Sequence, residues 1–254
     1  TSEVPATHHE VGLTEYIRAN FESTNGSKLV CAESVICNNK NLAQIYESLN
    51  YVPVWLSDKG ELKPEVESTI FILQNSYLDG LDPYRYHVHE INNLLKQIQL
   101  AQNTNHKNIE STLYVNFDIT VSDAYLSYAK DMQNGRINPI TTYPDWRVDR
   151  EMVDVTSQFE SSIANGDLLN NMQHMAPNNK MYQSLQTKLL EYYQMSNESS
   201  QNVLTDKDKD TMKQIALNMD RLRWLPHNLP ESYILVNIPR FELDIFVENG
   251  ESVV

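Results

Sequence analysis

The segment 204–247 places the strongest constraint on the fold, because its apolar pattern changes from helical to strand-like within a few residues. Thr205, followed three residues later by Asp208, predicts the capped start of a helix. Pro226 predicts where that helix ends, because a proline disfavours helical geometry in the preceding residue. Between them, apolar residues recur every three to four positions along one helical face, at Met212, Ile215, Ala216, Met219 and Leu222. The segment therefore indicates a junction between a helical part and a β-rich part.

A strand pattern follows this helix. Residues 233–238 are rich in β-forming side chains, and apolar and acidic residues then alternate over 241–248, as in a half-buried strand. Asn249-Gly250 predicts a tight hairpin turn, since both residues tolerate positive φ, so a return strand is expected after it. Because an isolated hairpin is only marginally stable in water, we interpret residues 231–254 as the start of a β-rich domain that is truncated in this chain.

The chain before residue 226 is predicted to be helical. The longest expected helix covers residues 109–133, where apolar side chains hold one face for six turns, and we expect it to be the central helix of the core. Shorter amphipathic patterns predict further helices on both sides of it. The predicted fold class is therefore mainly α, with a multi-helix scaffold domain over residues 11–226 and the first one or two β-strands of a truncated β-rich domain over 231–254.

Composition argues against several classes of partner and chemistry. The 254 residues carry a formal net charge of −14, which argues against nucleic acid and anionic membrane surfaces as partners. No stretch approaches the ~20 consecutive apolar residues of a transmembrane segment. The seven glycines form no phosphate-binding loop, and no Ser-His-Asp or paired-carboxylate motif stands out. We therefore predict no catalytic residue and no cofactor in this chain.

The two cysteines, Cys31 and Cys37, allow three interpretations. A disulfide closing a short loop fits an oxidising compartment, and we predict this bond. Two separate thiols are the alternative. A catalytic thiol is the third, but it needs a histidine base and an electropositive environment, and the neighbouring sequence suggests neither.

The His87-x-His89 pair raises the question of a metal site. Two imidazoles without a nearby third ligand do not make a zinc site, and this pair lies where a helix is expected to begin. The sequence therefore predicts no metal site.

Several segments carry a resemblance to one enzyme family. They are Tyr51-x-Pro53-x-Trp55-Leu56, Gly80-Leu81-Asp82-Pro83-x-x-Tyr86-His87, Asp123-Ala124-Tyr125-Leu126-x-Tyr128-Ala129, Gly135-Arg136-Ile137-x-Pro139 with Trp146, Asn218-Met219-Asp220-Arg221-Leu222-Arg223-Trp224-Leu225-Pro226, and Tyr233-Ile234-Leu235-Val236-Asn237-Ile238-Pro239 with Phe241-x-Leu243. With these segments the chain resembles the long periplasmic murein L,D-transpeptidases over most of its length.

The resemblance implies a function divided between two domains. In that family a helical scaffold precedes a β-rich catalytic domain, whose cysteine forms 3→3 cross-links between peptidoglycan stem peptides through an acyl-enzyme. The catalytic domain carries a His-Gly dipeptide and a Ser-x-Gly-Cys-x-Arg segment, and neither occurs in this sequence. Many relatives also insert a small peptidoglycan-binding module where this chain has only the polar segment 196–202. The implied function is the non-catalytic scaffold portion of this cell-wall transferase.

The resemblance also implies a location and partners. We expect an exported protein of the bacterial periplasm, with its signal peptide outside the given chain. The expected partner is the missing C-terminal catalytic domain, with peptidoglycan or other envelope proteins as further candidates. A stand-alone helical adaptor that binds another cell-envelope protein is the alternative, and an independent hydrolase using Cys31 ranks last.

Four residues at the junction are predicted to anchor one domain to the other, namely Arg221, Arg223, Trp224 and Asn237. The two arginines are two positions apart on a helix, so their guanidinium groups point about 200° apart and cannot clamp one carboxylate together. We expect each arginine to have its own partner and Trp224 to be buried where helix meets strand. A role as substrate ligands is not expected.

Overall fold

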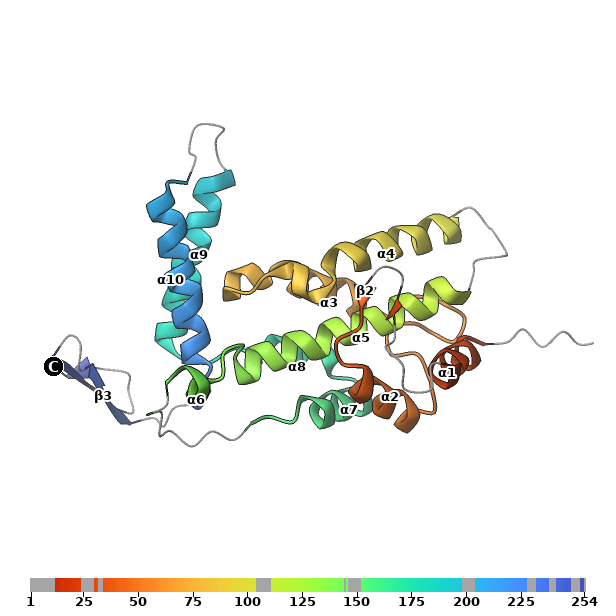
Figure 1. Ribbon diagram of the computed structural model, residues 1–254, viewed down its shortest axis with the longest axis horizontal. Helices are drawn as coiled ribbons and strands as arrows, with labels where there is room; N and C mark the ends of the chain where they lie inside the picture. Colours follow the sequence, from red (N-terminus) through yellow and green to blue (C-terminus); the bar gives the residue numbers. More distant parts are fainter. Residues whose placement is uncertain are drawn as a thin grey trace, which may run out of the picture. The chain divides into compact units, whose positions relative to one another are not determined.

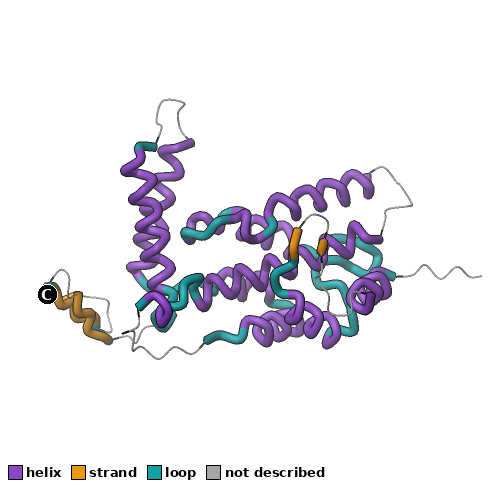
Figure 2. The backbone as a smooth tube through the Cα atoms, in the orientation of Figure 1, coloured by secondary structure: helices purple, strands orange, loops and turns teal. Residues whose placement is uncertain are grey.

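The computed structural model describes residues 12–23, 30–31, 34–103, 111–143, 145, 152–197, 204–227, 232–237, 241–247 and 252–253. Within these ranges ten α-helices and two 3₁₀-helices form most of the chain, and the strands belong to one short hairpin and one small sheet (Figure 2). The mainly α fold predicted from the sequence is confirmed. Within the same ranges, no helix combines the length and the apolar character that crossing a membrane requires.

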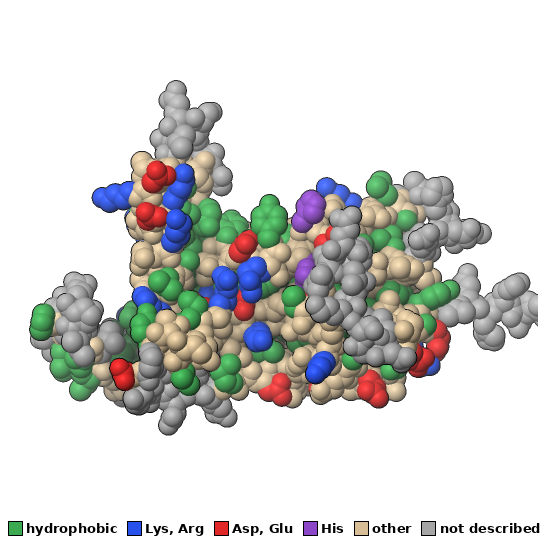
Figure 3. All heavy atoms as spheres, viewed as in Figure 1, with side chains coloured by type: hydrophobic (Ala, Val, Ile, Leu, Met, Phe, Trp, Pro, Cys, Tyr) green, Lys and Arg blue, Asp and Glu red, His purple; other side chains and the backbone are tan. Residues whose placement is uncertain are grey.

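The chain divides into two compact units, and the described residues of each are treated separately below. The first comprises Thr1–Arg136 and Met152–Met175, and the second comprises Ile137–Glu151 and Ala176–Val254. The boundary predicted from the sequence, between residues 226 and 231, lies within the second unit and does not coincide with this division. It stays a prediction. Basic and acidic side chains are interspersed over the described residues of the face drawn in Figure 3.

The first unit is built from helices and one two-stranded hairpin. Its elements are α1 Leu13–Ser23, β1 Val30–Cys31, β2 Ser34–Val35, α2 Asn39–Ser48, α3 Glu65–Gln74, η1 Ser76–Asp79, η2 Pro83–Tyr86, α4 Val88–Asn103, α5 Ser111–Asn134, α7 Val155–Asn165 and α8 Leu168–Gln173.

α5 is the central element of this unit. It contacts α1, α2, α3, α4 and α7, and Figure 1 shows it running between α3 and α4 on one side and α2 and α7 on the other. Every residue from Phe117 to Leu126 is buried, so the helix is enclosed around its circumference over this stretch. The central position predicted for this helix is confirmed.

The ends of several helices in this unit follow from the local sequence. Asp82 precedes η2 and accepts a hydrogen bond from the backbone N–H of Tyr84. Gly80 ends η1 with a φ of 67°, in the left-handed region that glycine adopts without steric cost. Asp154 accepts hydrogen bonds from two backbone N–H groups of the first turn of α7, which fixes the start of that helix at Val155.

The second unit contains a pair of long helices and a small sheet. Its elements are α6 Pro139–Thr142, α9 Lys180–Asn197, α10 Asp206–Leu222, β3 Tyr233–Asn237, β4 Glu242–Phe246 and β5 Ser252–Val253. α9 and α10 pack side by side (Figure 1), and the buried residues between them are Tyr182, Leu189, Ile215 and Met219. Thr205 and Asp208 form the capping box predicted for the start of α10, because the side chain of each accepts a hydrogen bond from the backbone N–H of the other.

The sheet is antiparallel, in the order β3-β4-β5. Ile234 pairs with Ile245 and Val236 pairs with Leu243, so these four apolar side chains share one face of the sheet. β5 pairs with β4, and the return strand expected after β4 is therefore present. The Asn249-Gly250 turn itself lies outside the described residues.

Candidate functional site

Three buried aspartates of α5 hold loops of the first unit in place. The first, Asp118, accepts hydrogen bonds from the backbone N–H of Val54 (2.9 Å) and of Trp55 (2.8 Å). Its Oδ1 also accepts a hydrogen bond from the Tyr46 hydroxyl at 2.6 Å. Backbone N–H groups buried away from water need such acceptors, so Asp118 fixes the path of the chain before and through Trp55.

Ser122 extends this network one turn further along α5. Its hydroxyl accepts a hydrogen bond from Trp55 Nε1–H (2.9 Å) and lies 2.9 Å from the Tyr46 hydroxyl. The Trp55 ring is fully buried and packs against the rings of Tyr125 and Phe159, with centroid distances of 6.0 and 6.4 Å. The polar tips of Tyr46 and Trp55 are therefore satisfied inside an apolar core.

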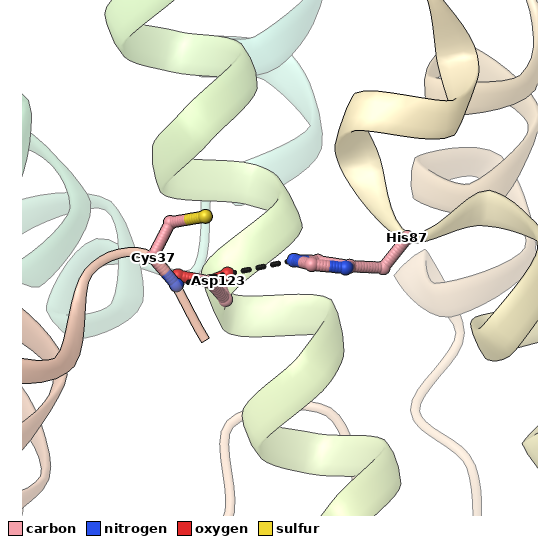
Figure 4. Close-up of side chains that lie close together, drawn as sticks. All are labelled: Cys37, His87 and Asp123. Carbon is pink, nitrogen blue, oxygen red and sulfur yellow. Dashed lines mark hydrogen bonds and ion pairs between the residues drawn. The ribbon is translucent and has the colours of Figure 1, made fainter. Parts of the chain in front are cut away.

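Asp123 connects two further segments to α5. Its Oδ1 accepts hydrogen bonds from the backbone N–H and the side-chain Nδ2 of Asn38, both at 2.8 Å. Its Oδ2 accepts a hydrogen bond from the backbone N–H of Cys37 at 3.0 Å. The same oxygen lies 2.8 Å from Nε2 of His87, and Figure 4 shows the histidine ring pointing at this carboxylate.

The electrostatics of this group favour a charged carboxylate beside a neutral thiol. Burial by itself raises the pKa of Asp123, but hydrogen bonds from His87, Cys37 and Asn38 outweigh it and leave the pKa below its ordinary value. The pKa of the Cys37 thiol is raised, first by burial and then by the negative charge of Asp123. The thiolate is the nucleophilic form of cysteine, so this environment does not activate Cys37 for attack.

The third aspartate, Asp131, binds the segment before α4. Its Oδ2 accepts a hydrogen bond from the hydroxyl of the buried Tyr86 at 2.9 Å. The guanidinium Nε atoms of Arg85 and Arg136 lie 3.7 and 3.9 Å from the same oxygen. Together the three aspartates hold the ends of the segments around Cys37, Trp55 and Tyr86.

The predicted disulfide residues are close in the chain but are described to different extents. Cys31 lies in β1, where its backbone pairs with Ser34 of β2, and its side chain lies outside the described part of the structure. Cys37 follows the hairpin, directly before Asn38 at the start of α2, and it is exposed. The bond between the two cysteines stays a prediction.

Among the predicted anchors, Arg223 is buried in the second unit. Its Nη2 donates a hydrogen bond to the Tyr182 hydroxyl at 2.6 Å, and its Nη1 lies 3.6 Å from a carboxylate oxygen of Asp220. The other oxygen of Asp220 accepts a hydrogen bond from the backbone N–H of Ile137 at 3.2 Å. Arg223 and Asp220 thus link the end of α10 to α9 and to the segment that precedes α6.

Arg221 has different partners and lies beside a cavity. It donates hydrogen bonds to the Tyr143 hydroxyl (2.6 Å) and to the side chain of Asn218 (2.9 Å). The Tyr143 ring lies 5.9 Å from that of the buried Trp224. A cavity of about 540 Å³ is lined by Tyr143, Asp145, Arg221, Leu222, Trp224 and Leu225. Each arginine has its own partners, as their helical spacing requires.

Asn237, the fourth predicted anchor, is placed only through its backbone. It pairs with Glu242 across β3 and β4, and its side chain lies outside the described part. The interdomain role of Arg221, Arg223, Trp224 and Asn237 stays a prediction.

Comparison with known protein families identifies the family of this chain. A family model described as Scaffold domain matches residues 40–189, which is more than half of the 254 residues. The chain belongs to this scaffold-domain family. A comparison with curated proteins finds no match.

The match covers the central part of the aspartate network in this scaffold domain. It begins shortly after Cys37 and Asn38 and ends within α9, so it contains Asp118, Asp123 and Asp131 with most of their partners. The predicted anchors Arg221, Arg223, Trp224 and Asn237 lie beyond the C-terminal end of this match.

Sequence reasoning missed the partners of these aspartates. The segments around Trp55, Tyr86 and Asp123 stand out in the sequence, but nothing in the spacing joins one to another. One signal was present: Asp118 and Asp123 lie among apolar residues in the middle of the longest predicted helix, and a buried polar residue usually has a hydrogen-bond partner. The His87-x-His89 spacing was not informative, since His87 meets Asp123 while the exposed His89 contacts Asn93.

Proposed function

We propose that this scaffold domain is the non-catalytic part of a peptidoglycan L,D-transpeptidase of the bacterial periplasm. The observation that carries the proposal is the scaffold-domain match over residues 40–189, because it spans four of the six segments in which the sequence resembles that family. Three of these segments contain Trp55, Tyr86 and Asp123. Trp55 donates a hydrogen bond to Ser122 of α5, Tyr86 donates one to Asp131 of α5, and Asp123, itself in α5, contacts His87.

The small sheet of the second unit supports the same proposal. Ile234, Val236 and Leu243 lie on one face of β3 and β4, yet 62%, 59% and 48% of their surfaces are exposed. Apolar side chains gathered on one face of a sheet are normally covered by another layer of the same domain. In our proposal that layer is the remainder of a β-rich catalytic domain, which supplies the cysteine for acyl transfer.

The scaffold acts in this proposal by holding the catalytic domain in position. The end of α10 leads towards β3, and it is fixed by the buried pair Arg223–Asp220 and by Trp224. A buried ion pair resists distortion, since moving one partner away leaves the other charge buried without it. The second unit is therefore expected to be rigid up to the last turn of α10.

The coding sequence beyond Val254 provides the first test. We expect it to continue into a His-Gly dipeptide and a Ser-x-Gly-Cys-x-Arg segment. The protein that contains both parts is expected to form a stoichiometric adduct with a carbapenem on the cysteine of that segment, because this thiol is the acyl-transfer nucleophile. Intact-mass analysis of the chain described here, run in parallel, is expected to show no adduct.

Two outcomes would contradict this proposal. The first is a reading frame that ends without such a segment. The second is an adduct on Cys31 or Cys37, which would make this chain itself the reactive part.

Location is tested by cell fractionation and thiol counting. We propose that the protein is recovered from the periplasm with Cys31 and Cys37 bonded, since that compartment is oxidising. The loop they close is short, so the bond is not expected to stabilise the fold by much more than ~2 kcal/mol. Two free thiols in periplasmic protein, counted in denaturant, would contradict the bond.

The cavity beside Arg221 favours a second candidate function, a helical adaptor for another envelope protein. Its walls combine the aromatic rings of Tyr143 and Trp224 with the guanidinium of Arg221, residue types that are enriched at protein interfaces. The reading frame separates the two candidates: an adaptor needs no Ser-x-Gly-Cys-x-Arg segment, whereas a transpeptidase does.

A further inference from the structure

Cys37, His87 and Asp123 bring three different metal-ligand types to one place in the first unit (Figure 4). A sulfur, a ring nitrogen and a carboxylate oxygen from these residues all lie within 4.8 Å of one another. Around a tetrahedral Zn²⁺ ion, with bonds of about 2.0–2.3 Å, neighbouring ligand atoms are about 3.5 Å apart. Shifts on the order of 1 Å, within the reach of side-chain rotation, would bring the three atoms to that spacing.

We propose that these three residues form a binding site for a divalent transition-metal ion of the zinc type. The ligand set is the argument for this class, because thiolate and imidazole select zinc and related metals over Mg²⁺ and Ca²⁺, which require oxygen ligands. The proposal departs from the expectation drawn from His87-x-His89, since the further ligands come from segments distant in the sequence. It does not rest on the proposed transpeptidase role, but it requires a reduced Cys37, whereas the proposed periplasmic protein has Cys37 bonded to Cys31.

The surroundings of the site orient its ligands. Oδ1 of Asp123 is held by two hydrogen bonds from Asn38, which leaves Oδ2 directed towards Cys37 and His87. His87 has a φ of 51° between η2 and α4, which fixes where its ring projects. Such outer contacts commonly orient the first ligands of a metal ion and strengthen its binding.

The site is closed on one side and accessible on the other. The Asp123 side chain is fully buried and that of His87 is 11% exposed, whereas Cys37 lies at the surface. An ion enters from the Cys37 side and keeps a water molecule or another small ligand in its fourth position. Binding through Nε2 requires the neutral His87 ring to carry its proton on Nδ1, and the Cys37 thiol proton is released to solvent.

The ion would join three elements that are separate in the sequence. Cys37 precedes α2, His87 precedes α4, and Asp123 lies in the middle of α5. Because a ligand that binds only the folded state stabilises it, the metal is expected to raise the unfolding temperature of the first unit. The Cys37 sulfur is also the predicted disulfide partner of Cys31. Because a disulfide sulfur cannot serve as a thiolate ligand, the metal is expected to bind only the reduced protein.

Cobalt titration of the full chain tests the site. Protein treated with chelator and reduced with a phosphine is titrated with Co²⁺ and followed by visible absorption. We expect one equivalent to bind with tetrahedral d–d bands and a thiolate-to-cobalt charge-transfer band, and Zn²⁺ to displace it. Protein oxidised beforehand so that Cys31 and Cys37 are bonded is expected to lack the charge-transfer band.

Two ligand variants and two matched controls make the test specific. Cys37→Ser is expected to abolish the charge-transfer band, and His87→Gln to weaken binding roughly tenfold or more. Cys31→Ser and His89→Gln remove the neighbouring thiol and imidazole and are expected to bind as the parent chain does. Circular dichroism of each variant verifies that the helices are intact.

Three results would overturn the proposal. One is a reduced, folded protein that gives no cobalt spectrum. Another is a charge-transfer band that survives Cys37→Ser but is lost in Cys31→Ser, which would assign the ligand to Cys31. The third is equal binding by folded His87→Gln and the parent chain.

Discussion

α5 and α10 are both long helices, but they bury their residues in different ways. α5 has 24 residues, and every position from Phe117 to Leu126 is enclosed, including Asp118, Ser122 and Asp123. α10 has 17 residues, of which only Ile215, Met219 and Asp220 are buried. Over this stretch the first helix is enclosed on all sides, whereas the second packs through one face.

The polar residues of the two helices correspondingly have different hydrogen-bond partners. The carboxylates of Asp118 and Asp123 accept hydrogen bonds from backbone N–H groups of loops that have no strand or helix to satisfy them. Most polar residues of α10 face water, and its one buried carboxylate pairs with Arg223. We therefore expect the stability of the packing around α5 to depend on its buried hydrogen-bond acceptors. The packing of α10 should depend on a few residues at its C-terminal end.

The largest effect is expected for Asp118→Ala. The substitution leaves the N–H groups of Val54 and Trp55 without their acceptor in the core and removes one hydrogen bond of the Tyr46 hydroxyl. Each such group costs about 1–3 kcal/mol, so unfolding free energy should fall by about 4 kcal/mol. Chemical denaturation followed by tryptophan fluorescence measures the loss.

The control for this prediction is Asp210→Ala on the exposed face of α10. Its side chain is 73% exposed and pairs only with Lys213 among the interactions seen, so a change within about 0.5 kcal/mol is expected. If Asp118→Ala unfolded at the same denaturant concentration as the control, the loop around Trp55 would not depend on α5.

The next largest effect is expected for Arg223→Ala in the second unit. Removing one member of a buried ion pair leaves the charge of Asp220 without compensation, at a cost of about 3 kcal/mol or more. Hydrogen exchange of the α9 and α10 amides measures the loss where it should occur.

Arg221→Ala is the matched control, because Arg221 is partly exposed and its partners are near the surface. Its removal should cost less than about 1 kcal/mol. Equal exchange in the two variants would show that α10 is not anchored through Arg223.

A smaller and pH-dependent effect is expected for Asp123→Asn. The amide oxygen accepts fewer of the four hydrogen bonds than the carboxylate does, which should cost about 2 kcal/mol at pH 7. The folded-state pKa of Asp123 is lowered, so its charge stabilises the fold above the unfolded value of about 3.9 and the contribution is lost as the pH falls through the folded value.

Urea unfolding at pH 7 and near pH 3 measures this difference. The gap between the parent chain and Asp123→Asn should narrow in acid. Asp210→Asn should stay within about 0.5 kcal/mol of the parent chain at both pH values. A gap that widened at low pH would contradict the charged state of Asp123.

The smallest effect is expected for Thr205→Ala at the start of α10. The hydroxyl accepts the Asp208 N–H at 3.2 Å in the capping box, and losing such a cap costs about 1 kcal/mol. Thr187→Ala, in the exposed middle of α9, is the control and should change the melting temperature little. Equal melting of the two variants would show that the cap does not limit the stability of α10.

The sequence by itself determined the local structure. Thr205 and Asp208 cap each other's backbone N–H groups when a helix starts there, and the apolar spacing after them defines one buried face. The long apolar pattern around Phe117 indicated a central helix for the same reason. These features depend on residues three or four positions apart, whose contacts helical geometry dictates.

Only the tertiary structure decided which distant segments meet. Cys37, His87 and Asp123 are separated by dozens of residues, and their backbone directions depend on how α2, α4 and α5 pack. From the sequence, an aspartate among apolar helix residues is expected to need a hydrogen-bond partner. Several loops carry N–H groups that could serve, so the sequence does not identify the partner. The choice among them is made by the packing of the whole unit, because a hydrogen bond requires its two atoms to lie within about 3 Å of one another.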